Sequence, residues 1–532
     1  MSKSVAKDKD VVVNTTAKKA IQEIALTTDA KGAEKIVKGK TTTKKATAKT
    51  KKTDTKVEKV EKIDPKAELE AEIKTTAYPL TDAQTLHYYT MKFCPAKQIL
   101  NIGTGLFIKD LVELDVLKEA IYKAYERWEV LRVRFAEDKD GNVYQYIADK
   151  EDRDIETVDL SDKSEEEVNA LLKSWTEQPL GGYGTPRNKI VLINLKDNYR
   201  GVYLCVDHMT LDAYGIIAIM GDVVQIYASL KFGLDYPKPV KSYIDAINKD
   251  FAYKTSKAYE ADKEFWKNYY GDKEPIYTDI RGSRILEEQR KLQNNPNLRA
   301  VNISTPSLVA RHQIYHLEAD PTRRLLEYSE RNGVPFLCVV LMGIRSYLSK
   351  MNNFEQDISF KSTVARRATL LEKKSGGTRV HFYPFRTIIN DNATFLDGVR
   401  ELQQKQNLMF QHANYSPIAV LNEIRETWNL KPGETYESLS VTYQPFMKEG
   451  QNELLDTINF KSSWYPNGVA GSPLYLTILH NPTTHGVSFM FEVKNDVHTE
   501  DDIEKFYYYL CKIIFMGVEH PDMTIGEIIH TV

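Results

Sequence analysis

Residues 206–215 read VDHMTLDAYG and carry the side chains in this sequence best suited to acid–base chemistry. His208 directly follows an apolar run, and Asp212 lies four residues later. Imidazole is the natural proton carrier near neutral pH, and general acid–base catalysis typically contributes about 10²–10⁴ in rate. A nearby carboxylate can raise the pKa of a histidine or fix its tautomer. One histidine and one aspartate beside a strand also occur in purely structural roles, so the surrounding sequence has to distinguish the two.

The elements around this segment place His208 at the end of a strand. Residues 189–195 and 201–206 are apolar runs separated by Asp197 and Asn198, which predicts two adjacent core strands. Residues 215–227 are apolar enough for a buried helix. A histidine between such a strand and such a helix lies at a sheet edge or a cleft, where functional groups are often found.

Further elements predict an α/β protein with two lobes. Thr81 or Asp82 can cap a helix over 83–89, residues 102–108 read as a strand, and residues 114–124 have the spacing of an amphipathic helix. Residues 130–135 resemble a half-buried strand, with a hairpin turn at Asp140-Gly141 into a strand over 143–147. Charged residues 249–273 and polar residues 281–297 lead to a second α/β half that begins near His312.

Composition separates a tail from the folded part. The chain has 532 residues, 42% of them hydrophobic, enough for one large core or two. Its first sixty or so residues hold roughly 17 lysines against about 8 acids and no aromatic residue, so they cannot bury enough apolar surface to fold. This tail is either a solvated spacer or a contact to a polyanion such as nucleic acid. We expect a disordered tail over 1–75, an N-terminal lobe over 76–275 and a C-terminal lobe over 276–532.

Other patterns restrict the class of protein. The four cysteines form no C-x-x-C pair, the N-terminus has no apolar signal segment, and no run approaches about 18 apolar residues, so we expect a cytoplasmic protein without a membrane span. The sequence has no G-x-S-x-G, P-loop or G-x-G-x-x-G motif. We expect no tightly bound cofactor. We also expect no bound metal, because six of the histidines lack metal-ligand spacing: His312, His316, His381, His412, His480 and His485.

Residues 206–215 resemble the H-H-x-x-x-D-G motif of nonribosomal peptide synthetase condensation domains and of related H-x-x-x-D acyltransferases in the chloramphenicol-acetyltransferase-like superfamily. His208 matches the catalytic second histidine, Asp212 matches the aspartate, and Asp207 stands where the first histidine usually is. Further segments resemble elements of the same family in order along the chain: 79–84 (S-x-A-Q), 127–135 (R-H-E-x-L-R-T-x-F), 265–266 (F-W), 357–367 (D-I-x-x-G-x-P-V-A-x-R), 377–386 (G-x-F-V-N-T-L-P-L-R) and 412–417 (H-Q-x-x-P).

The resemblance implies a fold and a set of roles. It implies two chloramphenicol-acetyltransferase-like lobes in a V, with a central tunnel through which donor and acceptor reach His208 from opposite faces. His208 would activate a small-molecule amine or alcohol for attack on a thioester carried by coenzyme A or by the phosphopantetheine of an acyl or peptidyl carrier protein. Asp212, which completes the catalytic motif, would pair with Arg367, or with Arg366 as the second choice, and Asp207 would support the site.

Two departures from the motif bear on turnover. Asp207 replaces the supporting first histidine, and Ala213 replaces a glycine, which could obstruct close approach of substrate to the backbone. Asp207 and Asp212 also satisfy the D-x-x-x-x-D pattern of heterocyclisation domains, but Gly215 stands where that motif has serine. The presence of His208 favours ordinary acyl transfer.

Two functions follow as hypotheses. The first is a stand-alone, monomeric acyltransferase of the condensation type, whose thioester donor comes from elsewhere because the sequence shows no adenylation motif and no carrier G-G-x-S element. The alternative is a catalytically lapsed binding or scaffold protein that is tethered through its basic tail. Neither the acyl donor nor the acceptor can be named from the sequence.

Overall fold

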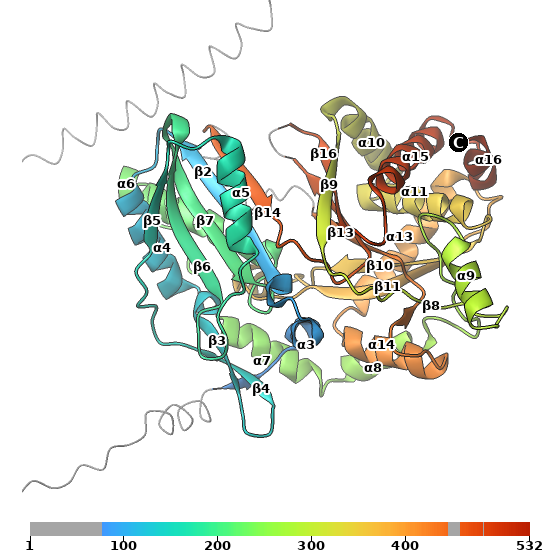
Figure 1. The fold of residues 1–532 in the computed structure, drawn as a ribbon, viewed down its shortest axis with the longest axis horizontal. Helices are drawn as coiled ribbons and strands as arrows, with labels where there is room; N and C mark the ends of the chain where they lie inside the picture. The colour runs from blue at the N-terminus through green and yellow to red at the C-terminus, as the bar shows by residue number, and fades with distance from the viewer. Residues whose placement is uncertain (1–76, 445–457, 482–483) are drawn as a thin grey trace, which may run out of the picture.

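The computed structural model describes residues 77–444, 458–481 and 484–532, which form two lobes side by side (Figure 1). The predicted tail, residues 1–75, lies outside the described residues. Each lobe is built on a β-sheet with helices packed against it. The predicted α/β class with two lobes is confirmed.

The N-terminal lobe contains a five-stranded sheet in the order β14-β2-β7-β6-β5. Its strands are β14 (Phe460–Tyr465), β2 (Asn101–Lys109), β7 (Tyr199–Asp207), β6 (Asn188–Leu195) and β5 (Glu156–Leu160). The two apolar runs predicted to be adjacent core strands are β6 and β7, which pair antiparallel, so this prediction is confirmed. Their central residues, Leu192 and Leu204, are almost fully buried.

Three helices pack around this sheet: α4 (Leu114–Arg127), α5 (Glu165–Thr176) and α6 (Ala213–Phe232). Helix α3 (Asp82–Phe93) lies below the sheet, towards the other lobe (Figure 1). Helices α4 and α6 pack against each other and α4 contacts β6 and β7, whereas α5 contacts β2 and β14. Helix α6 begins where Asp212 accepts a hydrogen bond from the Gly215 N–H and ends at Gly233, whose φ of 69° is the left-handed conformation common at helix ends.

Helix α6 is the most apolar long helix among the described residues. By length and composition alone it could span a membrane, with a mean hydropathy of 1.5, and the bent pair formed by α10 (Ala319–Asn332) and α11 (Phe336–Met351) could be a second span. Half of the 18-residue apolar stretch within α6 is buried, and Ile216 and Ile219 lie in the core of the lobe. The core helices of soluble proteins share this composition.

A small second sheet, in the order β1-β4-β3, lies beside α3. Its strands are β1 (Tyr78–Pro79), β3 (Val133–Glu137) and β4 (Val143–Ile147). The predicted hairpin turn at Asp140-Gly141 joins β3 to β4, and Gly141 has a φ of 82°. The prediction of a strand over 130–135 was wrong at its start, because Glu129–Arg132 form a 3₁₀ turn. The Glu129 carboxylate there accepts hydrogen bonds from the backbone of Tyr243 and Ile244, which fixes the turn.

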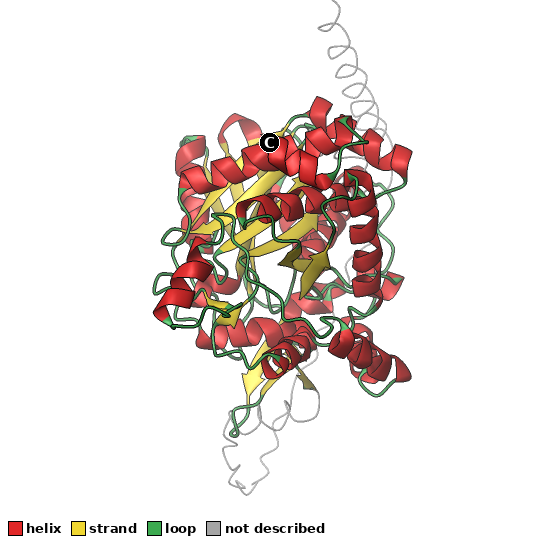
Figure 2. Cartoon of the chain, turned by 90° about the vertical axis from the view of Figure 1, so that its right-hand side faces the viewer, coloured by secondary structure: helices red, strands yellow, loops and turns green. Residues whose placement is uncertain are grey.

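The C-terminal lobe contains a six-stranded sheet in the order β11-β10-β13-β15-β16-β9. Its strands are β9 (Ala310–Leu317), β10 (Asp357–Val364), β11 (His381–Ile388), β13 (Leu439–Gln444), β15 (Leu474–His480) and β16 (Val487–Lys494). The first strand of this sheet along the chain, β9, contains His312. Figure 2 faces this side of the molecule and shows helices in front of the strands.

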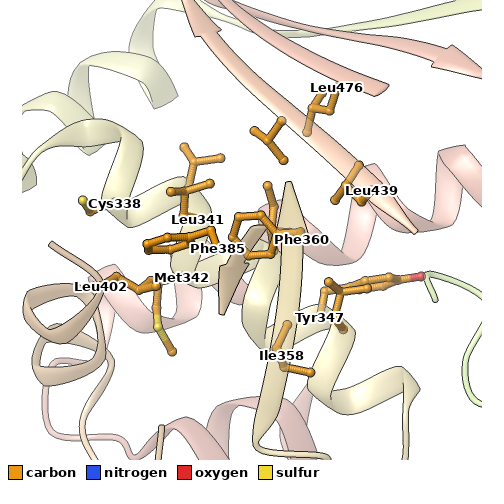
Figure 3. Close-up of a cluster of buried hydrophobic side chains, with 14 of the residues drawn as sticks. Cys338, Leu341, Met342, Tyr347, Ile358, Phe360, Phe385, Leu402, Leu439 and Leu476 are labelled. Carbon is orange, nitrogen blue, oxygen red and sulfur yellow. The ribbon is translucent and has the colours of Figure 1, made fainter. Parts of the chain in front are cut away.

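The core of the C-terminal lobe lies between that sheet and its helices. Besides α10 and α11, these are α13 (Phe395–Gln411), α14 (Pro417–Thr427), α15 (Glu500–Glu519) and α16 (Ile525–Thr531). The short helix α12 (Leu370–Lys374) instead contacts the helix over Tyr243–Tyr253. Leu341 of α11, Phe360 of β10 and Phe385 of β11 meet there (Figure 3). Each of these side chains has no exposed area, so the sheet is rigidly backed by helices.

The residues that join the two lobes are helical rather than irregular. The predicted connecting stretches contain α7 (Tyr243–Tyr253), α8 (Lys257–Asn268) and α9 (Arg284–Leu292), with the short pair β8 (Val301–Asn302) and β12 (Glu434–Thr435) beyond them. Trp266 of α8 is buried and its indole N–H donates to the carbonyl of His412 in the C-terminal lobe.

Strand β14 links the lobes through backbone hydrogen bonds. It lies between β13 and β15 in the sequence, both of which belong to the C-terminal sheet, but it pairs antiparallel with β2 of the N-terminal sheet over Gly103–Ile108. No sequence pattern indicated this exchange. The predicted lobe boundary near residue 276 stays a prediction.

A substitution at Gly201 tests the close approach of β7 to β2. A Cβ atom at Gly201 would lie 1.9 Å from the carbonyl oxygen of Leu106, so Gly201→Ala forces the two strands apart. We expect a loss of about 1–3 kcal/mol in the free energy of unfolding, measured by thermal or denaturant unfolding. Gly182→Ala is the control, since nothing lies within 4 Å of its Cβ position. Equal stability of the two variants would contradict this packing.

Candidate active site

His208 follows the last residue of β7, where the chain leaves the sheet. Its backbone N–H donates to the carbonyl of Leu100 at 2.8 Å, and the N–H of Thr210 donates to the carbonyl of Asp207 at 2.8 Å, so the chain turns tightly after the strand. The imidazole is only partly buried. Its Nδ1 atom lies 3.4 Å from the Oγ1 atom of Thr378, which belongs to the C-terminal lobe.

The surroundings of His208 favour a neutral ring with its proton on Nδ1. Burial lowers the pKa of His208 below 6.5, while Asp212, a hydrogen bond from the ring to its own backbone and Asp207 oppose the shift. Only Nδ1 can reach the carbonyl oxygen of the same residue, so this hydrogen bond favours the tautomer with the proton on Nδ1. The Nε2 atom then has a free lone pair, as a general base requires.

Asp212 binds Arg367 and does not face the reactants. The Arg367 guanidinium donates to both carboxylate oxygens of Asp212, at 2.7 and 2.8 Å, and both side chains are almost fully buried. The N–H of Arg379 donates to the same carboxylate at 2.9 Å. Burial raises the pKa of Asp212, but the charge and hydrogen bonds of Arg367 outweigh it and the net pKa lies below the usual value. Asp212 is therefore an ionised anchor that joins the two lobes.

Arg366, the second choice for this pairing, points elsewhere. Its guanidinium donates to Asp250 of α7 at 3.2 Å and lies 3.0 Å from Nε2 of His381. Arg379 donates to the same Asp250 at 2.8 Å. These three charged side chains form a second connection between the lobes, apart from His208.

Asp207 braces the turn that carries His208. Its carboxylate pairs with Arg187, and its Oδ1 accepts a hydrogen bond from the N–H of Met209 at 2.7 Å. The side chain is buried, so it supports the backbone rather than binding a reactant.

A central cavity of about 520 Å³ lies between the lobes and reaches His208. This volume falls within the usual range for small-molecule sites. Ala213, which replaces the glycine of the family motif, lies in its wall. The N-terminal lobe contributes Leu86, His87, Asn101, His208 and Ala213, and the C-terminal lobe contributes His312, Lys361, Phe382, Ser440, Tyr475 and Glu492.

An outer cavity of about 760 Å³ lies against another face of α6. Tyr214 lines it, whereas the preceding residue, Ala213, lines the central cavity, so the first turn of α6 borders both spaces. Four lysines also line the outer cavity: Lys238, Lys241, Lys373 and Lys374. The guanidinium of Arg367 lies 4.6 Å from the centre of the ring of Tyr214, which belongs to the first turn of α6.

His87 is a site residue that the sequence interpretation missed. It belongs to α3, lines the central cavity, and its ring stacks on that of His208 with centroids 4.1 Å apart. The two histidines are 121 positions apart in the chain, so no local motif connects them. The sequence did contain one indication that His87 is buried: it lies on the same helix face as Ala83 and Gln84, and all three are buried.

No metal centre is apparent in the part of the chain that the structure describes. Within those ranges, no group of three or more histidine, cysteine, aspartate or glutamate side chains could hold a metal ion.

Removing Arg367 tests the buried ion pair. Arg367→Met leaves the Asp212 carboxylate buried without its partner, and we expect a loss of about 3–5 kcal/mol in the free energy of unfolding. Because the pKa of Asp212 is lowered in the folded state, the stabilisation is present above the ordinary aspartate pKa and is lost as the pH falls through the lowered value. Between the lowered pKa of Asp212 and the ordinary aspartate pKa, the free energy of unfolding of Arg367→Met should therefore depend less on pH than that of the wild type.

Arg323→Met is the matched control for this experiment. Arg323 forms ion pairs at the surface of α10, with more than half of its side chain exposed, and its removal should leave the stability unchanged. A loss for Arg367→Met no larger than for Arg323→Met would contradict the anchoring role of the buried pair.

Curated relatives match most of this chain. It is 24% identical over 466 residues to surfactin synthase subunit 1 of Bacillus subtilis (strain 168), covering 86% of this chain and 12% of that protein. It is 20% identical over 473 residues to bacitracin synthase 2 of Bacillus licheniformis, covering 88% of this chain and 17% of the relative. The chain thus spans about a sixth or less of the length of these relatives.

Solved structures show the same fold. The first condensation domain of the calcium-dependent antibiotic synthetase, in complex with a substrate analogue, has a TM-score of 0.69 at 18% identity, covering 85% of this chain and 99% of that one. The starter condensation domain of rhizomide synthetase, in a mutant complex with C8-CoA, has a TM-score of 0.72 at 17% identity, covering 86% and 99%.

The family model for the condensation domain matches residues 74–531, which include both lobes and every site residue described above. Condensation domains catalyse the formation of amide or ester bonds. From the extent of this match, the chain belongs to the condensation domain family.

Proposed function

We propose that this protein is a stand-alone acyltransferase that transfers an acyl group from a thioester to an amine or hydroxyl acceptor, with His208 as the general base. The observation that carries this proposal is the position of His208, whose imidazole lies in the wall of a cavity open between the lobes. Asp212 and Asp207 are held by Arg367 and Arg187, so His208 is the group at this turn with a basic atom left for a reactant.

The proposed reaction needs only one base. The acceptor N–H or O–H gives its proton to Nε2 of His208 while the acceptor atom attacks the thioester carbonyl carbon. The resulting tetrahedral intermediate collapses with cleavage of the C–S bond, and the departing thiolate takes the proton back from His208. The base is thereby regenerated, and the Asp212–Arg367 pair keeps the turn in place throughout.

The donor is proposed to be a thioester of coenzyme A or of a phosphopantetheine arm on a carrier protein. Both carry phosphate, and the four lysines of the outer cavity supply positive charge on the far side of the turn that bears Ala213. A C8-CoA ligand is bound in the rhizomide synthetase domain that shares this fold. A carrier protein as partner, contact of the tail with a polyanion, a monomeric state and a cytoplasmic location stay predictions.

Removal of His208 tests the assignment. With C8-CoA as donor and the N-acetylcysteamine thioester of leucine as acceptor, thiol release and the acylated product are measured for the wild type and for His208→Ala. We expect a rate about 10²–10⁴ lower in the variant, because it lacks the base. His520→Ala, at the exposed end of α15, should keep the wild-type rate. Equal rates for the wild type and His208→Ala would refute the proposal.

The pH dependence gives a second test. This test uses an alcohol as acceptor, because an alcohol does not ionise in this pH range. The neutral form of His208 is the active form, so kcat/KM should rise with pH as His208 loses its proton and then level off. Burial lowers the pKa of His208, so the rise should be centred below 6.5 and full activity should already be reached near neutral pH. A pH profile of kcat/KM centred above 6.5 would contradict this environment.

A further inference from the structure

Two histidines from distant parts of the chain meet face to face at the central cavity. His87 comes from the middle of α3 and His208 from the end of β7. Their ring centroids are 4.1 Å apart and the ring planes differ by 28°, so the two imidazoles are stacked. In this arrangement the flat face of His87 limits how far the ring of His208 can tilt.

His87 is held too firmly to move away from this contact. Its side chain is only 6% exposed, and α3 begins with a capping box in which Thr81 and Gln84 exchange hydrogen bonds. The Gln84 side chain also donates to Gln145 at 2.8 Å and to the hydroxyl of Tyr243 at 3.1 Å. The helix that carries His87 is therefore tied to the small sheet and to α7.

An imidazole at this position does not serve stability. The Nε2 atom of His87 is buried and has no hydrogen-bond partner among the described residues. A buried polar atom without a partner destabilises the folded state, and an apolar side chain of similar size would remove this penalty. The contact that the ring does make is the stack on His208, which points to a role at that residue.

His87 stays neutral beside His208. Burial first, and then the nearby His208, lower the pKa of His87 well below its usual value. Asp212 and Asp207 face His208 and raise its pKa, and His381 is a titratable group close to His87. When His208 takes a proton, His87 therefore remains an uncharged ring against it, and an aromatic face stabilises an adjacent cation.

We propose that His87 is a positioning residue whose flat, anchored ring holds the imidazole of His208 with Nε2 available to the reactants in the central cavity. This inference rests on the proposed function for its catalytic consequence. Thr378 and the backbone of His208 hold the Nδ1 edge of the ring, and His87 restrains its face. Together these contacts fix the plane of the imidazole ring. Without them, the side chain of a histidine in a turn could rotate freely.

Two matched substitutions separate the flat ring from its nitrogens. His87→Phe keeps an aromatic face on His208, whereas His87→Leu removes it, and both eliminate the unpartnered nitrogen. Both variants should melt at a higher temperature than the wild type, so a loss of activity cannot come from unfolding.

With C8-CoA and the leucine thioester, we expect kcat of His87→Leu to fall about 10–100-fold with little change in either KM. His87→Phe should stay within about threefold of the wild-type kcat, because it restores the stacked face. The proposal is overturned if His87→Leu keeps the wild-type kcat, or if His87→Phe loses as much as His87→Leu.

A measurement without substrate keeps this inference separate from the proposed function. In protein labelled with ¹⁵N-histidine, the signals of His208 should show a proton on Nδ1 in the wild type and in His87→Phe, and a mixture of tautomers in His87→Leu. If the signals of His208 in His87→Leu still show a proton on Nδ1 alone, the positioning role is overturned, whatever rates the variant has. A wild type that shows the single tautomer but no His208-dependent transfer would instead count against the proposed function alone.

Discussion

The bidentate ion pair between Asp212 and Arg367 is the interaction on which the rest of the site depends. Asp212 belongs to the N-terminal lobe and caps the helix that follows the turn bearing His208, and Arg367 belongs to the C-terminal lobe. Both charges are buried, and a buried charge is tolerated only when it is paired and hydrogen-bonded. The pair therefore holds the lobes at one spacing, and the width of the central cavity follows from that spacing.

Other contacts between the lobes support the same arrangement. Asp250 of α7 receives hydrogen bonds from Arg366 and Arg379, and Glu372 beside them pairs with Lys249. The ring of His208 itself lies against Thr378, its own backbone and the stacked imidazole of His87.

The sequence predicted those features that depend on local pattern. Strands β6 and β7 and the buried helix α6 follow from apolar runs and a polar turn, and the structure has them where they were expected. The ion pair of Asp212 with Arg367 joins segments 155 residues apart, and it could be anticipated only through the resemblance to a known family. The fold and the central histidine were thus predictable.

The features that sequence did not predict depend on contacts between distant residues. The stack of His87 on His208 and the ion pair of Asp207 with Arg187 arise only when separate elements meet. The 3₁₀ turn over Glu129–Arg132 has apolar residues at strand-like positions, but the backbone of α7 binds the Glu129 carboxylate and sets the turn. No periodicity in residues 460–465 indicates that their partner is a strand more than 350 positions earlier.

The exchange of β14 between the lobes has a consequence for how this molecule can be divided. Because the chain leaves the C-terminal sheet, lends one strand to the N-terminal sheet and returns, no single cut separates two complete halves. A fragment that ends before residue 460 would present β2 as an open strand edge with unpaired N–H and C=O groups, which invites pairing with other chains. The N-terminal sheet is therefore complete only when a strand from the sequence of the C-terminal lobe is present.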